Sequence, residues 1–325
     1  MGRGGRQHEI LKSPNETDGS IISPSSFNNI VGLKSRSGVI PISHNQDSVG
    51  AMARTVIDAA ILLEVIQGVD PHDPATLDDN AVRHHNYRQF CRGINGFRGL
   101  SLGVVRNLNY TAIPQDQLRT FNKAINLIAK LGAQIKDPIN FEAADYFVSG
   151  DTELLIMKID FKRDIELYLK TLQNTNMKTL KDLIEFNNHN PDKEFSQYMP
   201  DQDIWLQSEK QTLTIHSPIY KQIFETNLNL SRANGGIDYL LDKHKLDALV
   251  MLSDDSTSPS AIAGYPIISV PLGYLTNETE GNTVGQPYGI AFCGRAWSEN
   301  ILLTLAHAFE QATSVRQRVK PLHAP

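Results

Sequence analysis

A turn near the start of the chain constrains its fold and chemistry more than any other stretch. The residues Thr17-Asp18-Gly19-Ser20 place a serine hydroxyl directly after a glycine. Glycine permits a sharp turn and a close approach to the backbone, and successive N–H groups in such a turn can converge on an anion. The turn therefore offers a nucleophile beside oxyanion donors, which acyl transfer requires. An ordinary polar loop has the same composition.

An ordered series of short motifs surrounds this turn, within residues 16–54. The series resembles the nucleophile segment of the amidase signature family, in which the same pieces follow in the same order. The Thr-Asp-Gly-Ser variant is similar to that of fungal-type amidases. The matching pieces are Gly19-Ser20-Ile21, Pro24-Ser25-Ser26, Val31-Gly32-Leu33-Lys34, Gly38-Val39-Ile40-Pro41, Asp47-Ser48-Val49-Gly50 and Met52-Ala53-Arg54-Thr55. Further pieces near the C-terminus, such as Ala263-Gly264-Tyr265-Pro266 and Gly294-Arg295-Ala296-Trp297, extend the resemblance to about residue 315.

The resemblance implies roles for the turn residues. Ser20 corresponds to the nucleophile that forms an acyl-enzyme, and the amides of Thr17, Asp18 and Gly19 correspond to the oxyanion hole. The family activates its nucleophile with a lysine and a bridging serine in a cis peptide, both further upstream. This chain begins 19 residues before Ser20. We therefore expect a domain that is truncated at its N-terminus, lacks both activating residues and is inactive by itself.

Composition limits the classes of partner and cofactor. The chain has 325 residues, with 31 basic and 36 acidic side chains and a net charge of −5, which argues against nucleic-acid or membrane surfaces. Residues 1–15 contain no apolar run, and we expect them to be a disordered lead-in. The two cysteines, Cys91 and Cys293, make neither a disulfide framework nor a cysteine zinc site. They favour a cytoplasmic protein.

Hydrophobic patterns predict an α/β fold. Thr55 and Asp58 form a capping-box pattern before a helix that ends near Gly68. A strand at 100–105, a helix at 116–131 and a strand from 133 then indicate a parallel crossover. Strands at 246–252, 267–271 and 288–292 precede a closing helix at 298–312. With the resemblance, these elements predict a mixed β-sheet core with helices on both faces, in one domain over residues 16–325.

The middle of the chain, residues 141–234, is mostly helical and polar. Four acidic residues there could be read as paired catalytic carboxylates, but lysines and arginines lie between them, which is typical of a solvated helix face. These residues are Glu153, Asp160, Asp164 and Glu166. Histidines in a polar loop, namely His72, His84 and His85, lack a third metal ligand at suitable spacing. We therefore expect no metal and no organic cofactor.

Three functions remain open. The first is an amidase, a hydrolase of carbon–nitrogen bonds other than peptide bonds, that acts on a small-molecule amide through Ser20. The second is a non-catalytic amidase homologue that binds a ligand or partner. The third is the subunit of a tRNA-dependent amidotransferase that shares the signature and works inside a complex. The fungal-type motifs favour the first, and self-association into a homo-oligomer is left open.

Overall fold

One mixed sheet forms the centre of the molecule. The computed structural model describes residues 15–35, 42–71, 74–78, 82–108, 113–197, 199–253, 257–276 and 284–318. Within them, eight strands form one sheet in the order β1-β3-β2-β7-β8-β6-β4-β5. The strands are β1 (Asn15–Glu16), β2 (Val31–Lys34), β3 (Ser48–Ala53), β4 (Ser101–Val105), β5 (Gln134–Ile139), β6 (Ala248–Leu252), β7 (Ile267–Tyr274) and β8 (Pro287–Cys293).

The strand directions confirm the predicted fold class. β4 is parallel to both β5 and β6, while the other neighbours pair antiparallel. The predicted crossover is therefore present, as β4, α3 (Gln115–Lys130) and β5. The strand expected from residue 133 continues to Ile139. The lead-in expected at 1–15 lies outside the described residues except for Asn15, which belongs to β1.

Helices cover both faces because the central strands are apolar on both sides. In β6, Val250 packs into one apolar cluster while Leu249 and Met251 pack into the other, as the alternation along a strand requires. The first cluster lies under α2 (Val56–Ile66), α3 and α12 (Glu299–Thr313). The second lies under α4 (Ala144–Ser149), α10 (Ile237–His244) and α11 (Ser258–Ala263).

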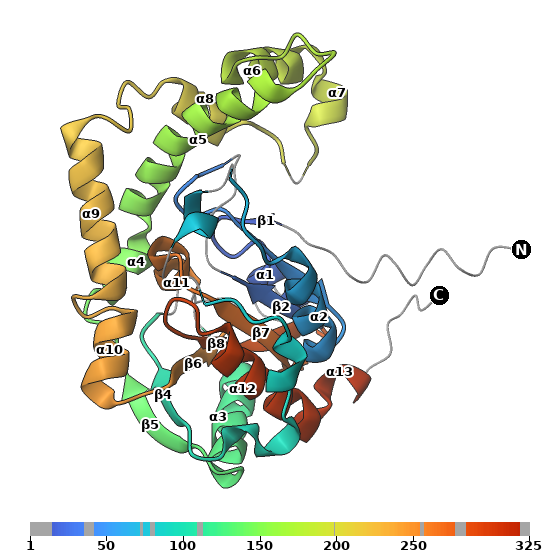
Figure 1. Cartoon of the computed structure of the whole chain (residues 1–325). Coiled ribbons are helices and arrows are strands. Elements are labelled where there is room, and N and C mark those ends of the chain that lie inside the picture. The colour runs from blue at the N-terminus through green and yellow to red at the C-terminus, as the bar shows by residue number, and fades with distance from the viewer. Residues whose placement is uncertain are drawn as a thin grey trace, which may run out of the picture.

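A helical part rises from one end of the sheet (Figure 1). It contains α5 (Asp151–Thr171), α6 (Leu180–His189), α7 (Pro191–Glu194), α8 (Asp203–Glu209) and α9 (Pro218–Arg232). It contains two small apolar clusters. One is centred on Ile156, Ile159 and Tyr220, and the other on Phe161, Leu180 and Ile184. A capping box formed by Thr179 and Asp182 begins α6. Much of the helical part is therefore held together by contacts of its own.

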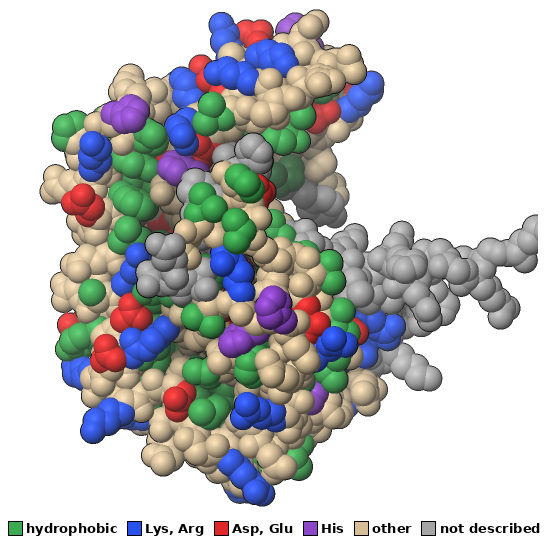
Figure 2. All heavy atoms as spheres, viewed as in Figure 1, with side chains coloured by type: hydrophobic (Ala, Val, Ile, Leu, Met, Phe, Trp, Pro, Cys, Tyr) green, Lys and Arg blue, Asp and Glu red, His purple; other side chains and the backbone are tan. Residues whose placement is uncertain are grey.

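The remaining elements are short. In the described residues they are α1 (Ile22–Phe27), α13 (Val315–Arg318) and 3₁₀ helices at Pro74–Leu77, Tyr87–Phe90 and Gly93–Phe97. Both signs of charge are interspersed on the face drawn in Figure 2, so no single-sign field covers it. None of the described helices has the length and apolar character that crossing a membrane requires. Cys293 is buried and Cys91 half-buried, both as free thiols.

Candidate functional site

The Ser20 turn lies immediately before α1, and its serine is exposed. Gly19 has a φ of +83°, in the left-handed region that favours glycine. A Cβ atom on Gly19 would also lie 3.1 Å from the Ser23 hydroxyl. The carbonyl of Gly19 accepts a hydrogen bond from the Ser23 amide at 2.7 Å. The turn therefore requires glycine and places the hydroxyl of Ser20 at the surface.

Side chains on three sides hold this turn in place. Glu16 Oε2 accepts hydrogen bonds from the amides of Ile21 at 2.7 Å and Ile22 at 2.9 Å, so Glu16 joins the two ends of the turn. The hydroxyl of Thr17 donates to Asp47 Oδ1 at 2.6 Å. Asp18 Oδ2 accepts from the hydroxyl of Ser258 at 2.8 Å. The turn is thus fixed from its own strand, from the loop before β3 and from the N-terminus of α11.

Beneath the turn lies a fully buried lysine. Lys34, at the end of β2, donates from Nζ to the carbonyl of Tyr265 at 3.2 Å. Burial lowers the pKa of Lys34, and the charge of Glu16 opposes this shift. Burial likewise raises the pKa of Glu16, against the charge of Lys34 and the two amide hydrogen bonds. The two side chains therefore offset each other's cost of burial.

A pocket of about 340 Å³ opens beside the turn. Thr17, Asp18 and Ser20 line one side of it, so the structure brings three of the four predicted site residues to one cavity. Gly19, the fourth, lies between them in the turn. The other walls come from Ile42, from α5 through Leu154, Met157, Lys158 and Phe161, and from α8 through Ile204, Trp205 and Ser208.

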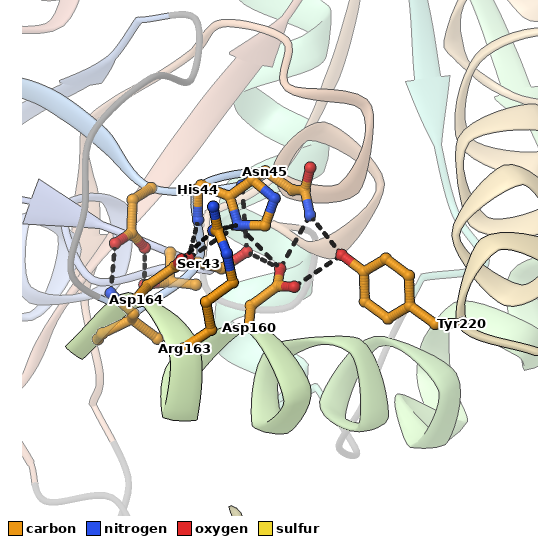
Figure 3. A network of polar contacts seen from close by, with 10 residues as sticks. Ser43, His44, Asn45, Asp160, Arg163, Asp164 and Tyr220 are labelled. Carbon is orange, nitrogen blue, oxygen red and sulfur yellow. Dashed lines mark hydrogen bonds and ion pairs between the residues drawn. The ribbon is translucent and has the colours of Figure 1, made fainter. Parts of the chain in front are cut away.

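A network of hydrogen bonds joins the loop at residues 43–46 to α5 and α9 (Figure 3). We call it the loop–α5 network. Each of the four loop side chains forms a hydrogen bond with a carboxylate of α5. Ser43 Oγ and Asn45 Nδ2 donate to Asp160 at 2.6 and 2.9 Å. His44 Nδ1 bonds to Asp164 at 2.8 Å, and Gln46 Nε2 donates to Glu153 at 2.7 Å. Asp160 also accepts from the hydroxyl of Tyr220 on α9 at 2.6 Å. Since Asp47 follows the loop and holds Thr17, the network connects the α5 wall to the Ser20 turn.

The network corrects the expectation of a solvated acidic face on α5. Glu153, Asp160 and Asp164 are buried, and only Glu166 of that set is half-buried. Burial raises the pKa of Glu153 and of Asp160. Residues 153, 160 and 164 recur at helical spacing and so share one face. The expectation was wrong because the loop that covers this face lies more than 100 residues earlier in the chain.

His44 gives the network a dependence on pH. Burial alone would lower its pKa, but the hydrogen bond with Asp164 and the charges of Asp160 and Asp164 raise it. Protonated His44 therefore stabilises the fold fully below about pH 6.5, its unfolded-state pKa, and this contribution is lost as pH rises through the raised folded-state pKa.

We expect His44→Asn to lower the free energy of unfolding by about 1 kcal/mol at pH 5.5, because a hydrogen bond to a charged group is lost at a partly exposed site. The deficit should shrink by pH 8.5, as urea titrations at several pH values would measure. The exposed His216 provides a control, since His216→Asn should produce no such trend. A His44→Asn deficit that stays constant with pH would contradict this interpretation.

The remaining groups that the sequence singled out are the Ser20 hydroxyl and the loop histidines. Within the described residues, the Ser20 hydroxyl has no hydrogen-bond partner. His84 packs against Tyr87 and Phe90, with ring centroids 5.4 and 4.7 Å apart, which is an aromatic packing role. His72 lies outside the described residues. No group of three metal-ligating side chains occurs in the part of the chain that the structure describes.

Comparisons with known proteins find amidases and amidotransferase subunits among the relatives of this chain. A probable amidase of Arabidopsis thaliana is 35% identical over 314 residues, which cover 94% of this chain and 57% of that protein. A glutamyl-tRNA(Gln) amidotransferase subunit of Microcystis aeruginosa is 27% identical over 334 residues, or 96% of this chain and 66% of that protein. The chain thus spans little more than half the length of the Arabidopsis relative.

The fold of the chain is similar to that of solved amidases. The structure of native peptide amidase from Stenotrophomonas maltophilia superposes with a TM-score of 0.84 and 31% identity, over 96% of this chain and 63% of that one. The amidase family model matches residues 11–303, which include the Ser20 turn, the loop–α5 network and most of the sheet. The chain therefore belongs to the amidase family, whose members carry the amidase signature.

Proposed function

We propose that this protein hydrolyses a carboxylic amide through an acyl-enzyme on Ser20. The observation that carries the proposal is the position of Ser20, which is exposed on a turn that requires glycine and lines the pocket together with Thr17 and Asp18. Family membership supports amide chemistry in general, and the pocket supplies room for a substrate beside the hydroxyl.

The proposed reaction has two steps. The Ser20 oxygen attacks the amide carbonyl, the carbon–nitrogen bond breaks and the amine leaves with a proton. Water then attacks the acyl-serine and releases the carboxylic acid. The amides of Thr17, Asp18 and Gly19 are proposed to donate to the oxyanion of both tetrahedral intermediates. The serine, these donors and water suffice for the reaction, so we propose no metal or organic cofactor.

We further propose that this 325-residue chain, taken by itself, has no measurable turnover. The support is that no described base contacts the Ser20 hydroxyl, and an unactivated serine is a weak nucleophile. In a serine protease, removal of the catalytic triad costs about 10⁶ in rate. A loss of that size would place amide hydrolysis below the background of an assay.

A fluorophosphonate probe tests both statements. We expect the chain to be labelled slowly, with Ser20→Ala abolishing the labelling and Ser23→Ala, the nearby half-buried serine of α1, leaving it intact. Labelling that survives Ser20→Ala would remove the acyl-enzyme proposal. Rapid labelling that disappears in Ser20→Ala would show instead that the site is activated in this chain, and only the proposal of inactivity would fail.

A non-catalytic homologue is the second candidate, favoured by the absence of a described partner for the Ser20 hydroxyl. It predicts ligand binding without any labelling at Ser20. An amidotransferase subunit is the third, favoured by the Microcystis relative, although the Arabidopsis amidase is more similar. It predicts a stable protein partner on purification from the native source, whereas a stand-alone amidase predicts a monomer or homo-oligomer.

A further inference from the structure

We propose that the pocket beside Ser20 takes a small uncharged amide with one aromatic or branched apolar group next to its carbonyl. This inference rests on the proposed function, because it names the substrate class for the same site. It follows from three properties of the pocket, namely the chemistry of its walls, its volume and the state of its charged groups.

The walls that face the Ser20 turn are mostly apolar. Phe161 of α5 and Trp205 of α8 lie with ring centroids 5.8 Å apart and both line the pocket. Ile204 also lines it and is 55% exposed, and Ile42 is 40% exposed. Apolar side chains left open to water gain stability when a ligand covers them. An aromatic or branched group fits this lining, with its ring against Phe161 and Trp205.

The volume limits the size of that group. At about 340 Å³, the pocket lies near the lower end of the 300–1,000 Å³ that is usual for ligand sites. A carboxamide must occupy the part next to Ser20, which leaves room for one ring or a short branched chain. A long acyl chain or a peptide would extend beyond these walls.

Both charged side chains at the pocket make a hydrogen bond within the protein, although Asp18 Oδ1 has no partner among the described residues. Lys158 donates from Nζ to Gln207 Oε1 at 2.6 Å, and Asp18 accepts from Ser258. Burial raises the pKa of Asp18, which favours its neutral form. A charged ligand would lose its hydration here and would have to displace an existing hydrogen bond. An uncharged ligand avoids both costs.

Calorimetric titration of the full chain with three ligands tests the inference without requiring turnover. We expect phenylacetamide to bind about 10–100-fold more tightly than acetamide, because burial of one ring accounts for that factor. Phenylacetate should bind more weakly than phenylacetamide. Equal affinity for acetamide and phenylacetamide would overturn the assignment of an apolar group. Tighter binding of phenylacetate would overturn the assignment of an uncharged ligand.

Two matched isoleucines locate the binding site. Ile204 and Ile219 are 55% and 50% exposed, and only Ile204 lines the pocket. We expect Ile204→Gln to weaken phenylacetamide binding about 3–10-fold and Ile219→Gln to change it less than about twofold. Similar losses in both variants would overturn the site. Because both side chains are exposed, circular dichroism should show that both variants fold.

The Ser20→Ala variant separates this inference from the proposed function. Since the ring supplies most of the affinity, Ser20→Ala should keep the preference of about 10–100-fold for phenylacetamide over acetamide. Selective binding combined with a Ser20 that no probe acylates would refute the acyl-enzyme and support the ligand class. Acylation of Ser20 at equal rates by acetyl and phenylacetyl probes would support the acyl-enzyme and overturn the ligand class.

Discussion

Replacing Lys34 by methionine should destabilise the folded chain by about 3–5 kcal/mol, the usual cost of leaving a buried charge without its partner. Methionine keeps the length and most of the volume of the side chain, so lost packing contributes little. The large cost arises because Glu16, itself fully buried, would lose the charge that opposes its desolvation. Glu16 also holds the amides of Ile21 and Ile22, so the Ser20 turn should loosen as well.

Urea unfolding followed by circular dichroism measures this effect. The exposed Lys130 of α3 is the control, and Lys130→Met should change stability by less than about 0.5 kcal/mol. Adding Glu16→Gln to Lys34→Met should recover part of the loss, because the unpaired charge is then removed. A loss below about 1 kcal/mol in Lys34→Met would show that the lysine is already neutral in the folded protein.

Replacing Asp160 by alanine should cost about 2–4 kcal/mol, since three donors, two of them buried, lose the same carboxylate together. These donors are Ser43 Oγ, Asn45 Nδ2 and the hydroxyl of Tyr220. Asp160→Asn keeps the shape and one acceptor oxygen, so its cost should be intermediate. Because the network joins α5 to the Ser20 turn, Asp160→Ala should also weaken ligand binding in the pocket.

Glu166 supplies the control for Asp160 on the same helix. It is half-buried and takes no part in the loop–α5 network, so Glu166→Ala should stay within about 0.5 kcal/mol of the unmodified chain. A double-mutant cycle with Tyr220→Phe should give a coupling energy of about 0.5–3 kcal/mol, as for side chains in one hydrogen-bond network. Equal losses in Asp160→Ala and Glu166→Ala would contradict the role of the network.

The Ser20 turn and the strands from β4 to β8 could be predicted from the sequence because their information is local. Gly19 and Ser20 are adjacent, and a turn that needs glycine is visible in the residues themselves. The crossover from β4 to β5 could be predicted for a related reason. Its strands and helix are consecutive, and the hydrophobic period changes between them. Each of these predictions depends on neighbours along the chain.

The loop–α5 network could not be predicted, because its two sides are far apart in the chain and both are polar. Asp160 and Asp164 lie among Lys158, Lys162 and Arg163, a pattern that is usually solvent-exposed. Periodicity places them on one helix face but says nothing about what covers that face. Only the position of residues 43–46 against α5 shows that the carboxylates are buried and bonded.

The helical part has small apolar clusters of its own, and this has an evolutionary consequence. The residues of α5 and α8 that shape the pocket can change with little effect on the packing of the sheet, whose first strand leads into the Ser20 turn. Substitutions confined to the helical part can thus change which ligands the pocket accepts while the sheet stays the same. A library randomised only at Leu154, Met157, Ile204 and Trp205 would be an economical route to altered selectivity in this protein.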